Sequence, residues 1–536
     1  MKAFALSTIA ILAGVASAAS PAEFRQVSGI YEVATDRFAL ANLSTTQPCN
    51  LTAETYCGGT WQGLINNLDY IQGMGLDTVW ISPVPTNTPN GYHGYWTLDL
   101  YTVNSYYGTP QDLGNLSKAL HDRNMYLMVD VVVNDMGLAG TDADVDYAAY
   151  TPFNDQSYFH TECNIDYNNQ TSVNDCWLEG LPDLRTEDPD VYNVFNSWIS
   201  DLVANYSIDA LRIDAVKSID KPFFPPFVNA SGGIYSMGEN YDGDPVYTCG
   251  YQEGVMPGLE NFPVYFPLVR ALQATNGSFA DLVALQAEVA ANCQDPTLLT
   301  NFAENADVPR FASYTSDESL QKNALTYVFM ADGIPYIYYG QEQQFNGAAD
   351  PYNREALWTS NYNTKAPLYQ YISILTKMRK SVISATPTYT TSLTKMLYND
   401  TNYLAMLKGV TGNQVLTVLT NVGAGGANNT INVSGTGYTT GESLTDVISC
   451  ETTAANTNGD LAIPISGGMP RVFYPTSKLG GSGLCGNALA NTTTGNNPSS
   501  TGSTASHSPT GASSQTSMSF SILSAAFLVG LGMLLL

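Results

Sequence analysis

The chain has 536 residues, 8 cysteines and a formal net charge of −27 at pH 7. A chain of this length can bury more than one hydrophobic core. The acidic balance excludes nucleic acid and anionic membrane surfaces as partners, because both need clustered Lys and Arg, whereas a neutral substrate tolerates it.

Residues 1–18 are predicted to be a secretory signal peptide. Lys2 precedes an apolar run over 3–15, and small residues at 16–18 stand where a signal peptidase cuts. The mature chain is expected to begin near Ala19. The even number of cysteines fits this route, because disulfides persist in oxidising compartments. Eleven Asn-x-Ser/Thr sequons also predict N-glycosylation along it.

Strand-like and helix-like runs alternate through the first 380 residues. Apolar residues at helical spacing over 64–71 end at Gly75, and the run 77–84 that follows reads as a buried strand. The same order recurs at 191–202 and 210–216. Repeated β/α units indicate a parallel sheet, so the α/β fold class and a (β/α)8 TIM barrel over 19–135 and 185–387 are expected.

Two other regions break this alternation. Residues 136–184 are irregular and rich in Asp, Tyr and Asn, and long irregular segments in compact proteins are usually functional. From residue 388 to 486 the pattern changes to short β-rich runs with Gly and Thr, including 404–410 and 415–422. This pattern predicts a C-terminal antiparallel β-sandwich domain.

The C-terminal end has the composition of a lipid-anchor signal. A linker rich in Ser, Thr, Gly and Asn spans 487–518, and an apolar tail without charge spans 519–536. Small residues at 511–513, a polar spacer and the short tail match a GPI-attachment signal. A single-pass membrane anchor is the alternative, but such a helix is usually longer and has a basic flank. Both predict a protein at the cell surface or cell wall, facing outward.

Three carboxylates stand where apolar runs end. Asp214, Glu239 and Asp307 each follow a strand-like segment, and in a parallel β/α barrel the carboxyl ends of the strands carry the functional groups. A single such acid would usually be a solvated surface residue. Arg212 and Arg310 lie near two of them, and a neighbouring arginine favours an ionised carboxylate. Three converging acids predict glycoside chemistry.

The three runs resemble, in the same order, motifs of the α-amylase family of retaining glycoside hydrolases. The resemblance covers most of residues 22–480. Further stretches resemble secreted fungal α-amylases, namely TDRFA at 35–39, 56–75, YHGYW at 92–96, 125–134, GDPVYTC at 243–249 and NREALW at 353–358. The family places a small domain after the third barrel strand, and 136–184 falls there.

The resemblance implies roles for individual residues. Asp214 corresponds to the nucleophile, Glu239 to the general acid and base, and Asp307 to a third acid that stabilises the transition state. Structural ion pairs and packing are the alternatives for the remaining charged and aromatic positions. The positions that correspond to substrate-binding residues are Tyr95, Trp96, Asp135, Arg212, Lys217, Gly243, Asp350 and Arg354.

A Ca²⁺ ion and four disulfides are also implied by the resemblance. Asn134 and Asp183 match oxygen ligands, while Asn174 and Ser218 match positions that contribute backbone carbonyls. Taken alone, Asn134 and Asp183 would more often be turn or cap residues. The spacing of eight cysteines leaves 105 connectivities open. The implied pairs are Cys49 with Cys57, Cys163 with Cys176, Cys249 with Cys293, and Cys450 with Cys485.

The chain departs from the family at three histidines. Asp135, Ser218 and Ala306 stand where the family motifs carry His. The family histidines of the first and fourth motifs donate hydrogen bonds to the sugar being cleaved, and each lost bond costs about 1–3 kcal/mol. Slow hydrolysis is therefore expected, while the covalent chemistry is retained.

These departures favour one of three hypotheses. Secreted fungal members with GPI signals and altered motif histidines resemble 4-α-glucanotransferases of cell-wall α-glucan, so transfer is favoured. An endo-hydrolytic α-amylase is the second hypothesis, and a non-catalytic glucan-binding wall protein is the third. The expected partners are an α-1,4-glucan or maltooligosaccharide and a GPI lipid anchor, and a monomer is expected.

Overall fold

The computed structural model describes residues 19–141 and 144–489. The predicted signal peptide, nearly all of the predicted linker and the predicted lipid-anchor tail lie outside these residues.

Eight parallel strands form the central sheet. In spatial order they are β10 (Gly258–Leu259), β9 (Tyr235–Gly238), β8 (Ala210–Ile213), β5 (Tyr126–Val131), β2 (Thr78–Ile81), β1 (Ile30–Val33), β12 (Ile334–Tyr338) and β11 (Thr300–Asn301). The two end strands meet through a parallel bridge between Glu260 and Thr300, where Asn261 N donates to Thr300 O at 3.0 Å. The sheet is therefore a nearly closed barrel, which confirms the predicted fold class.

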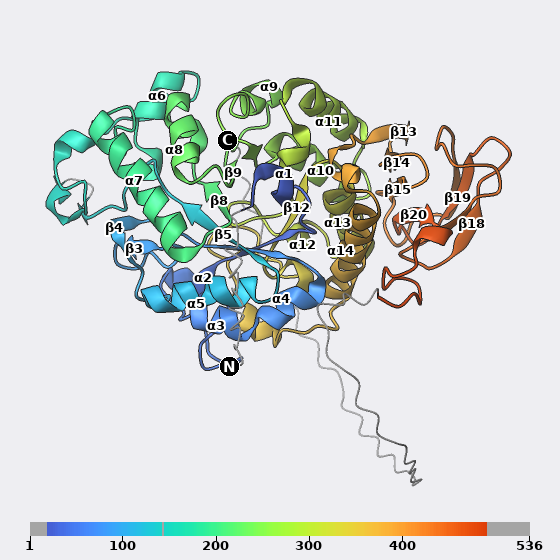
Figure 1. Cartoon of the computed structure of the whole chain (residues 1–536), viewed down its shortest axis with the longest axis horizontal. Coiled ribbons are helices and arrows are strands. Elements are labelled where there is room, and N and C mark those ends of the chain that lie inside the picture. The colour runs from blue at the N-terminus through green and yellow to red at the C-terminus, as the bar shows by residue number, and fades with distance from the viewer. Residues whose placement is uncertain (1–18, 142–143, 490–536) are drawn as a thin grey trace, which may run out of the picture. The chain divides into compact units, whose positions relative to one another are not determined.

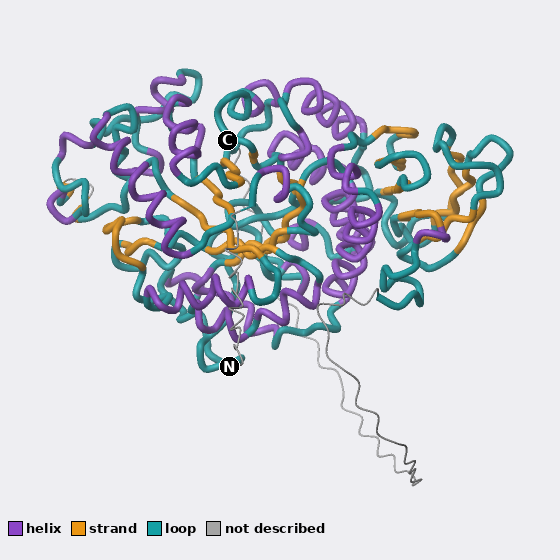
Figure 2. Tube along the Cα trace, viewed as in Figure 1, coloured by secondary structure: helices purple, strands orange, loops and turns teal. Residues whose placement is uncertain are grey.

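Helices surround this barrel (Figures 1 and 2). The longer ones are α3 (Trp61–Asn66), α4 (Leu68–Met74), α5 (Pro110–His121), α7 (Pro189–Tyr206), α8 (Phe224–Ala230), α10 (Phe262–Leu272), α11 (Ala280–Asn292), α13 (Glu318–Met330) and α14 (Pro367–Ala385). Each connects one parallel strand to the next or covers the sheet from outside, as β/α crossovers require.

Local sequence signals set the helix ends. α7 begins after Asp188, whose side chain caps Asp190 N, and Pro189 takes the first helical position, where a missing N–H costs nothing. Its apolar residues at 191–202 are buried, as predicted. The predicted helix over 64–71 is two helices, α3 and α4, separated at Asn67. α4 ends at Gly75, which adopts the left-handed conformation (φ 86°).

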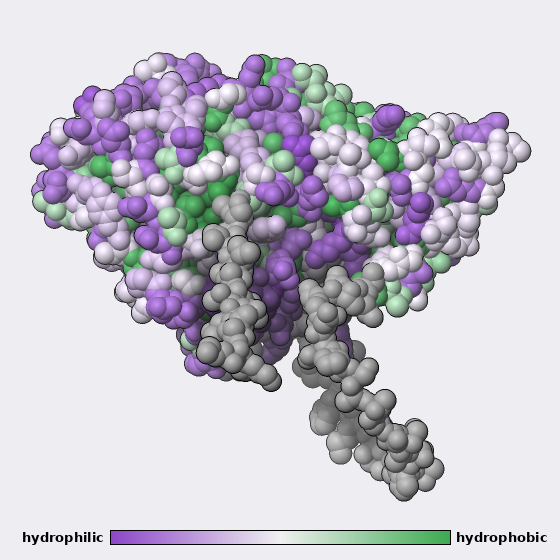
Figure 3. All heavy atoms as spheres, in the orientation of Figure 1, coloured by the Kyte–Doolittle hydropathy of each residue, from purple (hydrophilic) through white to green (hydrophobic). Residues whose placement is uncertain are grey.

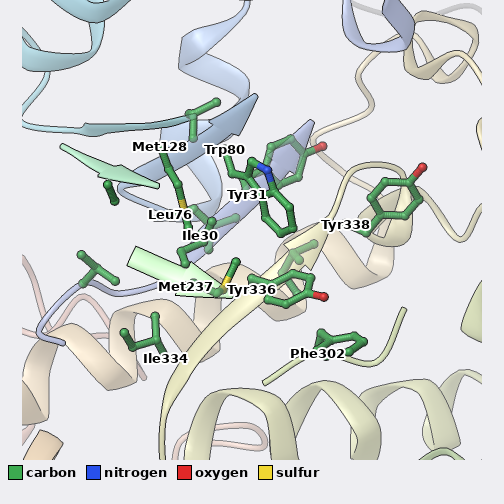
Figure 4. Close-up of a cluster of buried hydrophobic side chains, with 14 of the residues drawn as sticks. Ile30, Tyr31, Leu76, Trp80, Met128, Met237, Phe302, Ile334, Tyr336 and Tyr338 are labelled. Carbon is green, nitrogen blue, oxygen red and sulfur yellow. The ribbon is translucent and has the colours of Figure 1, made fainter. Parts of the chain in front are cut away.

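The barrel interior is packed with large apolar side chains. Figure 4 shows Ile30 and Tyr31 from β1, Trp80 from β2 and Met237 from β9 gathered in one buried cluster. Phe302 stacks on Tyr336 with ring centroids 4.8 Å apart. The barrel is therefore a solid core, and ligands have to bind at its ends.

The segment between β5 and α7 carries little regular structure. It contains β6 (Gly140–Thr141), β7 (Asp144–Val145) and α6 (Gln170–Asp175), with 3-10 turns between them. Backbone bridges from Asp135 to Asp183 and from Phe159 to Leu184 bring its two ends together. A separate hairpin after β2, β3 (Pro85–Asn87) and β4 (Thr97–Val103), carries the YHGYW run in its loop.

The C-terminal part is antiparallel. A six-stranded sheet has the order β13 (Lys395–Asn399), β14 (Tyr403–Lys408), β15 (Val415–Thr420), β20 (Arg471–Pro475), β17 (Ser443–Asp446) and β18 (Thr452–Ala454). β16 (Asn429–Val433) pairs separately with β19 (Leu461–Ile465). Asn323 on α13 links barrel and sheet, since it accepts from Thr420 N and donates to Gly468 O, both at 2.8 Å.

All four predicted disulfide pairings are confirmed. The structure joins Cys49–Cys57, Cys163–Cys176, Cys249–Cys293 and Cys450–Cys485. Figure 3 shows hydrophilic residues over much of the visible surface, with apolar residues in smaller patches. Within 19–141 and 144–489, no helix is both long and apolar enough to cross a membrane.

Candidate active site

A cleft of about 460 Å³ contains the three predicted carboxylates. Asp214 follows β8, Glu239 follows β9, and Asp307 lies in the loop after β11; all three line the cleft. Asp214 N donates to Val131 O at 3.0 Å and Glu239 N to Ile213 O at 2.9 Å, so strand pairing continues to the residues themselves. The barrel thereby brings together acids that are up to 93 positions apart in the sequence.

Asn305 orients the third carboxylate through the backbone. Its Oδ1 accepts from Asp307 N at 2.9 Å and from Val308 N at 3.1 Å. Asn353 donates to the carbonyls of Ala306 and Val308, both at 2.9 Å. The loop that presents Asp307 is therefore fixed on both sides of the carboxylate.

Arg212 joins the first two carboxylates to two deeper ones. Its Nη1 contacts Asp214 Oδ1, and its Nη2 lies 3.1 Å from Glu239 Oε2. The same guanidinium reaches Asp130 at 3.2 Å and Glu260 at 3.1 Å. Since Arg212 is 2% exposed, these charge-assisted contacts lie in a desolvated environment and hold both carboxyl groups rigidly.

Burial raises the pKa of both Asp214 and Glu239, and the Arg212 guanidinium opposes the shift in both. Nearby Asp130 and Asp135 add to the shift of Asp214, while Asp214 and Asp307 add to that of Glu239. Two adjacent buried carboxyl groups resist losing both protons. Ionisation of either group therefore makes ionisation of the other harder, and Arg212 contacts both.

The predicted pairing of Arg310 with Asp307 is wrong. Arg310 is fully buried and contacts Glu304 at 3.0 Å and Glu355 at 3.1 Å instead. The reason is direction: Arg310 points into the packed loops behind the site, whereas Asp307 faces the cleft with 44% of its side chain exposed.

Arg354 is the cation at Asp307. Its Nη2 lies 3.5 Å from Asp307 Oδ1 and its Nε lies 2.9 Å from Asp350 Oδ1. All three residues line the cleft. Arg354 therefore holds the carboxylates of Asp307 and Asp350 at the cleft, where a sugar hydroxyl can reach both.

Tyr95 and Trp96 also line the cleft, beside His93. Tyr95 Oη donates to Asp130 Oδ2 at 2.8 Å, and the Trp96 ring meets the His93 ring edge-on with centroids 4.7 Å apart. Burial lowers the pKa of His93 to about 3, so its ring stays neutral. Aromatic faces held in this way can pack on a sugar ring.

Lys217 and Tyr241 form a further part of the cleft rim. Lys217 Nζ donates to Tyr241 O at 2.8 Å, and the Tyr241 side chain packs on Phe262 with centroids 4.6 Å apart while remaining 39% exposed. Gly243 is not among the residues that line the cleft; a Cβ there would lie 3.2 Å from Phe266. The missing side chain lets the loop pass close to α10.

The positions without histidine have distinct surroundings. Asp135 is 4% exposed, lines the cleft, accepts from Asn134 Nδ2 at 3.3 Å, and its Oδ1 has no partner among the described residues. Burial raises the pKa of Asp135 to about 8. Ser218 lines the cleft with a buried Oγ that is likewise unpartnered within the described chain. Ala306 presents only a methyl group.

The predicted calcium ligands fit a hard cation in part. Asp183 is fully buried, and its Oδ1 has no partner among the described residues while its Oδ2 accepts from His160 Nδ1 at 2.6 Å. The Asn174 side chain is occupied by Gln170 and Asp220, which leaves its carbonyl as the possible donor. Over 19–141 and 144–489, no three His, Cys, Asp or Glu side chains gather as a metal site. The donor set is one carboxylate with amide and carbonyl oxygens, which suits Ca²⁺.

Sequence reasoning missed Asp130, Glu260 and Tyr241. The sequence does carry a signal for Asp130, because an aspartate inside the apolar strand run 125–134 is buried and needs a cation or hydrogen-bond donor as partner. Glu260 follows a strand of only two residues, which carries no periodicity. Tyr241 lies two residues after Glu239, and the sequence alone does not distinguish a cleft tyrosine from one that packs in the core.

The fold and site together define a parallel β/α barrel with three carboxylates at its carboxyl end, two of which contact Arg212 and the third Arg354. Residues 32–366 match the family model "Alpha amylase, catalytic domain", and residues 396–493 match "Alpha-amylase, domain C". The chain therefore belongs to the α-amylase family and is a glycosidase that acts on α-glucans.

Known α-amylases match this sequence along most of its length. Alpha-amylase 2 of Schwanniomyces occidentalis is 47% identical over 482 residues, which are 88% of this chain and 94% of the relative. Alpha-amylase 3 of Schizosaccharomyces pombe is 40% identical, covering 87% and 84%. The solved α-amylase from Malbranchea cinnamomea superimposes with a TM-score of 0.85 at 50% identity, covering 87% of this chain and all of that one.

Proposed function

We propose that the chain is a retaining α-amylase-family enzyme that cleaves α-1,4-glucosidic bonds and favours 4-α-glucan transfer, in the metabolism of cell-wall α-glucan. The observation that carries this proposal is the cleft beside Asp214. It retains all three acids, Asp135 lines it where the family carries an imidazole, and Ala306, at the other histidine position, lines the small cavity next to it.

In the first chemical step, Asp214 is the nucleophile. A carboxylate oxygen of Asp214 bonds to C1 of the sugar while the bond from C1 to the leaving O4 breaks, and the proton of Glu239 passes to O4. Arg212 contacts both groups, so it stabilises the carboxylate form of Asp214 and fixes Glu239 beside the leaving oxygen. Burial supports the protonated form of Glu239 by raising its pKa.

In the second step, the now ionised Glu239 acts as base. It takes a proton from an acceptor hydroxyl, whose oxygen bonds to C1 while the bond to Asp214 breaks, which regenerates both side chains. If the acceptor is water the reaction is hydrolysis, and if it is a sugar the glucan chain is transferred. Asp307, held near Arg354, is proposed to stabilise positive charge on the sugar in both steps.

Two features of the cleft support transfer. The hydrogen bond lost at Asp135 slows the turnover of the glycosyl-enzyme by roughly five- to a hundredfold, if it acts in the transition state. The aromatic rim is retained, since Tyr241 is 39% exposed and Tyr167, 66% exposed, also lines the cleft. A slowly turned-over glycosyl-enzyme leaves time for an acceptor sugar to bind at this rim and compete with water.

Incubation with maltoheptaose tests the proposal. The wild-type protein is expected to yield products longer than the donor, because transfer elongates chains and hydrolysis cannot. Chromatographic sizing over a range of donor concentrations measures this, with transfer products rising as the acceptor concentration rises. If only shorter sugars form at every concentration, the endo-hydrolytic α-amylase is the correct function.

The endo-hydrolytic α-amylase is the second candidate because the curated relatives carry that name. A non-catalytic wall protein is the weakest candidate, since none of the three acids is missing and Arg212 contacts two of them. Complete absence of any new product from maltoheptaose would favour it.

Calcium is proposed to bind through Asn134, Asp183 and the carbonyls of Asn174 and Ser218, joining the 136–184 segment to the barrel. Chelation with EGTA is expected to lower the Tm of the wild type by about 3–5 °C, the effect of an ion present at about 100 times its Kd. Differential scanning calorimetry with and without calcium measures the shift.

Two variants distinguish a specific site from general calcium binding. Asp183→Asn removes the only proposed carboxylate ligand and should abolish the calcium-dependent shift. Asn174→Ala removes a side chain already bonded to Asp220 and should retain the shift, because the carbonyl remains. A full shift in Asp183→Asn would contradict this ligand set.

The protein is further proposed to act outside the cell as a monomer attached through a GPI lipid. Four disulfides support an oxidising compartment. The attachment signal itself is inferred only from the composition of 487–536, which lies almost wholly outside the described residues.

A further inference from the structure

A second, much smaller cavity lies next to the substrate cleft. It measures about 20 Å³ and is lined by residues that include Glu32, Trp80, Ala306 and Tyr338. Tyr95 and Arg354 line both this cavity and the main cleft, so the two are adjacent. A volume of this size accommodates one water molecule when polar partners surround it.

Glu32 and Tyr338 supply those partners from neighbouring strands. Glu32 on β1 is in register with Trp80 on β2 and with Tyr338 on β12, so the three side chains leave the sheet on the same face. Trp80 Nε1 donates to Asp130, and the Arg212 guanidinium lies 5.5 Å from the Trp80 ring. This face is therefore the barrel interior, directly beneath the cleft.

Both polar groups are buried and unpartnered. Glu32 is 5% exposed and Tyr338 is fully buried, and neither Glu32 Oε2 nor Tyr338 Oη has a hydrogen-bond partner among the described residues. Buried polar groups in native proteins almost always have a partner, which is often an ordered water. The cavity that these two groups share is the natural location for one.

The charge around Glu32 determines how it can bind a water. Burial raises the pKa of Glu32 well above its ordinary value, the carboxylates of Glu260 and Asp307 add to this, and Arg212 opposes it. Glu32 is therefore a neutral carboxylic acid that can donate as well as accept. With the Tyr338 hydroxyl, it can orient a water whose remaining bonds point toward the cleft.

Ala306 contributes only a methyl group to the wall of this cavity. Ala306 directly precedes Asp307 in the chain, and Asp307 is the acid that faces the cleft next to Arg354. We propose that Glu32 and Tyr338 hold one water molecule behind Ala306, and that this water hydrogen-bonds the sugar bound beside Asp307. Glu32 is thus a positioning residue, and this role is the same whether the glycosyl group passes to water or to a sugar.

The test measures kcat/KM for total maltoheptaose consumption, which does not depend on the ratio of transfer to hydrolysis. Glu32→Leu should lower kcat/KM by about fivefold, the loss of one water-mediated hydrogen bond. Glu32→Gln should stay within about twofold of the wild type, because the amide keeps a donor and an acceptor. Tyr338→Phe should lose a similar amount to Glu32→Leu.

Tyr389→Phe is the matched control. Tyr389 is 1% exposed and its hydroxyl is also unpartnered within the described chain, but it does not line the cavity. It should change neither kcat/KM nor the water. An equal loss in Tyr389→Phe, or equal losses in Glu32→Leu and Glu32→Gln, would mean that the effect is structural.

A double-mutant cycle isolates the water. Ala306→Val fills the cavity with apolar atoms and should lower kcat/KM by about fivefold on its own. Adding Glu32→Leu to this variant should lower kcat/KM no further, because the water is already displaced. If the losses in kcat/KM of the two single variants multiply in the double variant, the proposal is overturned. It is also overturned if Glu32→Leu has the same kcat/KM as the wild type. A high-resolution crystal structure should show one ordered water between Glu32 and Tyr338. A cavity without this water would overturn the proposal. The structural result does not depend on activity, so it tests the proposal even if the protein proves inactive.

Discussion

Replacing Asp214 by Asn is expected to lower kcat by at least about 10⁴-fold, the scale on which loss of a nucleophile or its base reduces turnover. An amide is a poor nucleophile toward an anomeric carbon, so no covalent glycosyl-enzyme can form. The fold should survive, because the amide oxygen can still accept from Arg212 Nη1. Turnover of maltoheptaose and circular dichroism measure the two effects.

Trapping identifies the nucleophile directly. A fluorinated glucosyl donor should add one glycosyl group to the wild type, and peptide mass spectrometry should locate it on Asp214. Asp350→Asn is the matched control, because it makes the same chemical change at a cleft acid that contacts Arg354 instead of Arg212. It should still form the adduct. An adduct on any other residue would overturn the assignment.

The barrel was predictable because periodicity and burial agree. The run 210–216 contains β8, with all four strand residues buried, and the run 191–202 lies on the buried face of α7. Carboxylates at the ends of these runs had to meet, since parallel strands in a barrel end at the same rim. The short strand β10 could not be found this way, because two residues carry no period.

The electrostatics of the site were not predictable from local spacing. Arg212 was expected to lower the pKa of its neighbour Asp214, but burial outweighs it and the pKa is raised. The same arginine also serves Asp130 and Glu260, which lie 82 and 48 positions away. Arg310 illustrates the opposite error: it is three residues from Asp307, yet it pairs with Glu304 and Glu355. Charge partners depend on side-chain direction, which the sequence does not contain.

The three histidine replacements connect the sequence to the choice between hydrolysis and transfer. Asp135 adds a buried acid near Asp214 and contributes to raising the pKa of the Asp214 carboxyl group. Ala306 removes an imidazole but opens the cavity where Glu32 and Tyr338 are proposed to hold a water. The two positions therefore differ in effect: the first places a buried carboxyl group beside Asp214 in place of an imidazole, and the second is proposed to keep a water-mediated contact.

Restoring both histidines, Asp135→His with Ala306→His, is expected to raise hydrolysis of soluble starch by about tenfold or more. One recovered hydrogen bond of about 1–3 kcal/mol gives roughly five- to a hundredfold in rate. Most of the gain should come from Asp135→His, because it adds a donor and removes a carboxyl group beside Asp214. Ala306→His alone should give about twofold or less, since it replaces a proposed water-mediated bond by a direct one. Release of reducing sugar measures the rate.

Asp135→Asn separates the two causes of that gain. It removes the carboxyl group without adding an imidazole, so it should recover only the part of the increase that comes from easier ionisation of Asp214. The share of elongated products from maltoheptaose should fall in the double variant, because water then competes better for the glycosyl-enzyme. If the double variant has the wild-type Tm and its starch hydrolysis remains at the wild-type rate, the missing imidazoles do not limit hydrolysis, and the preference for transfer has to arise elsewhere in the cleft.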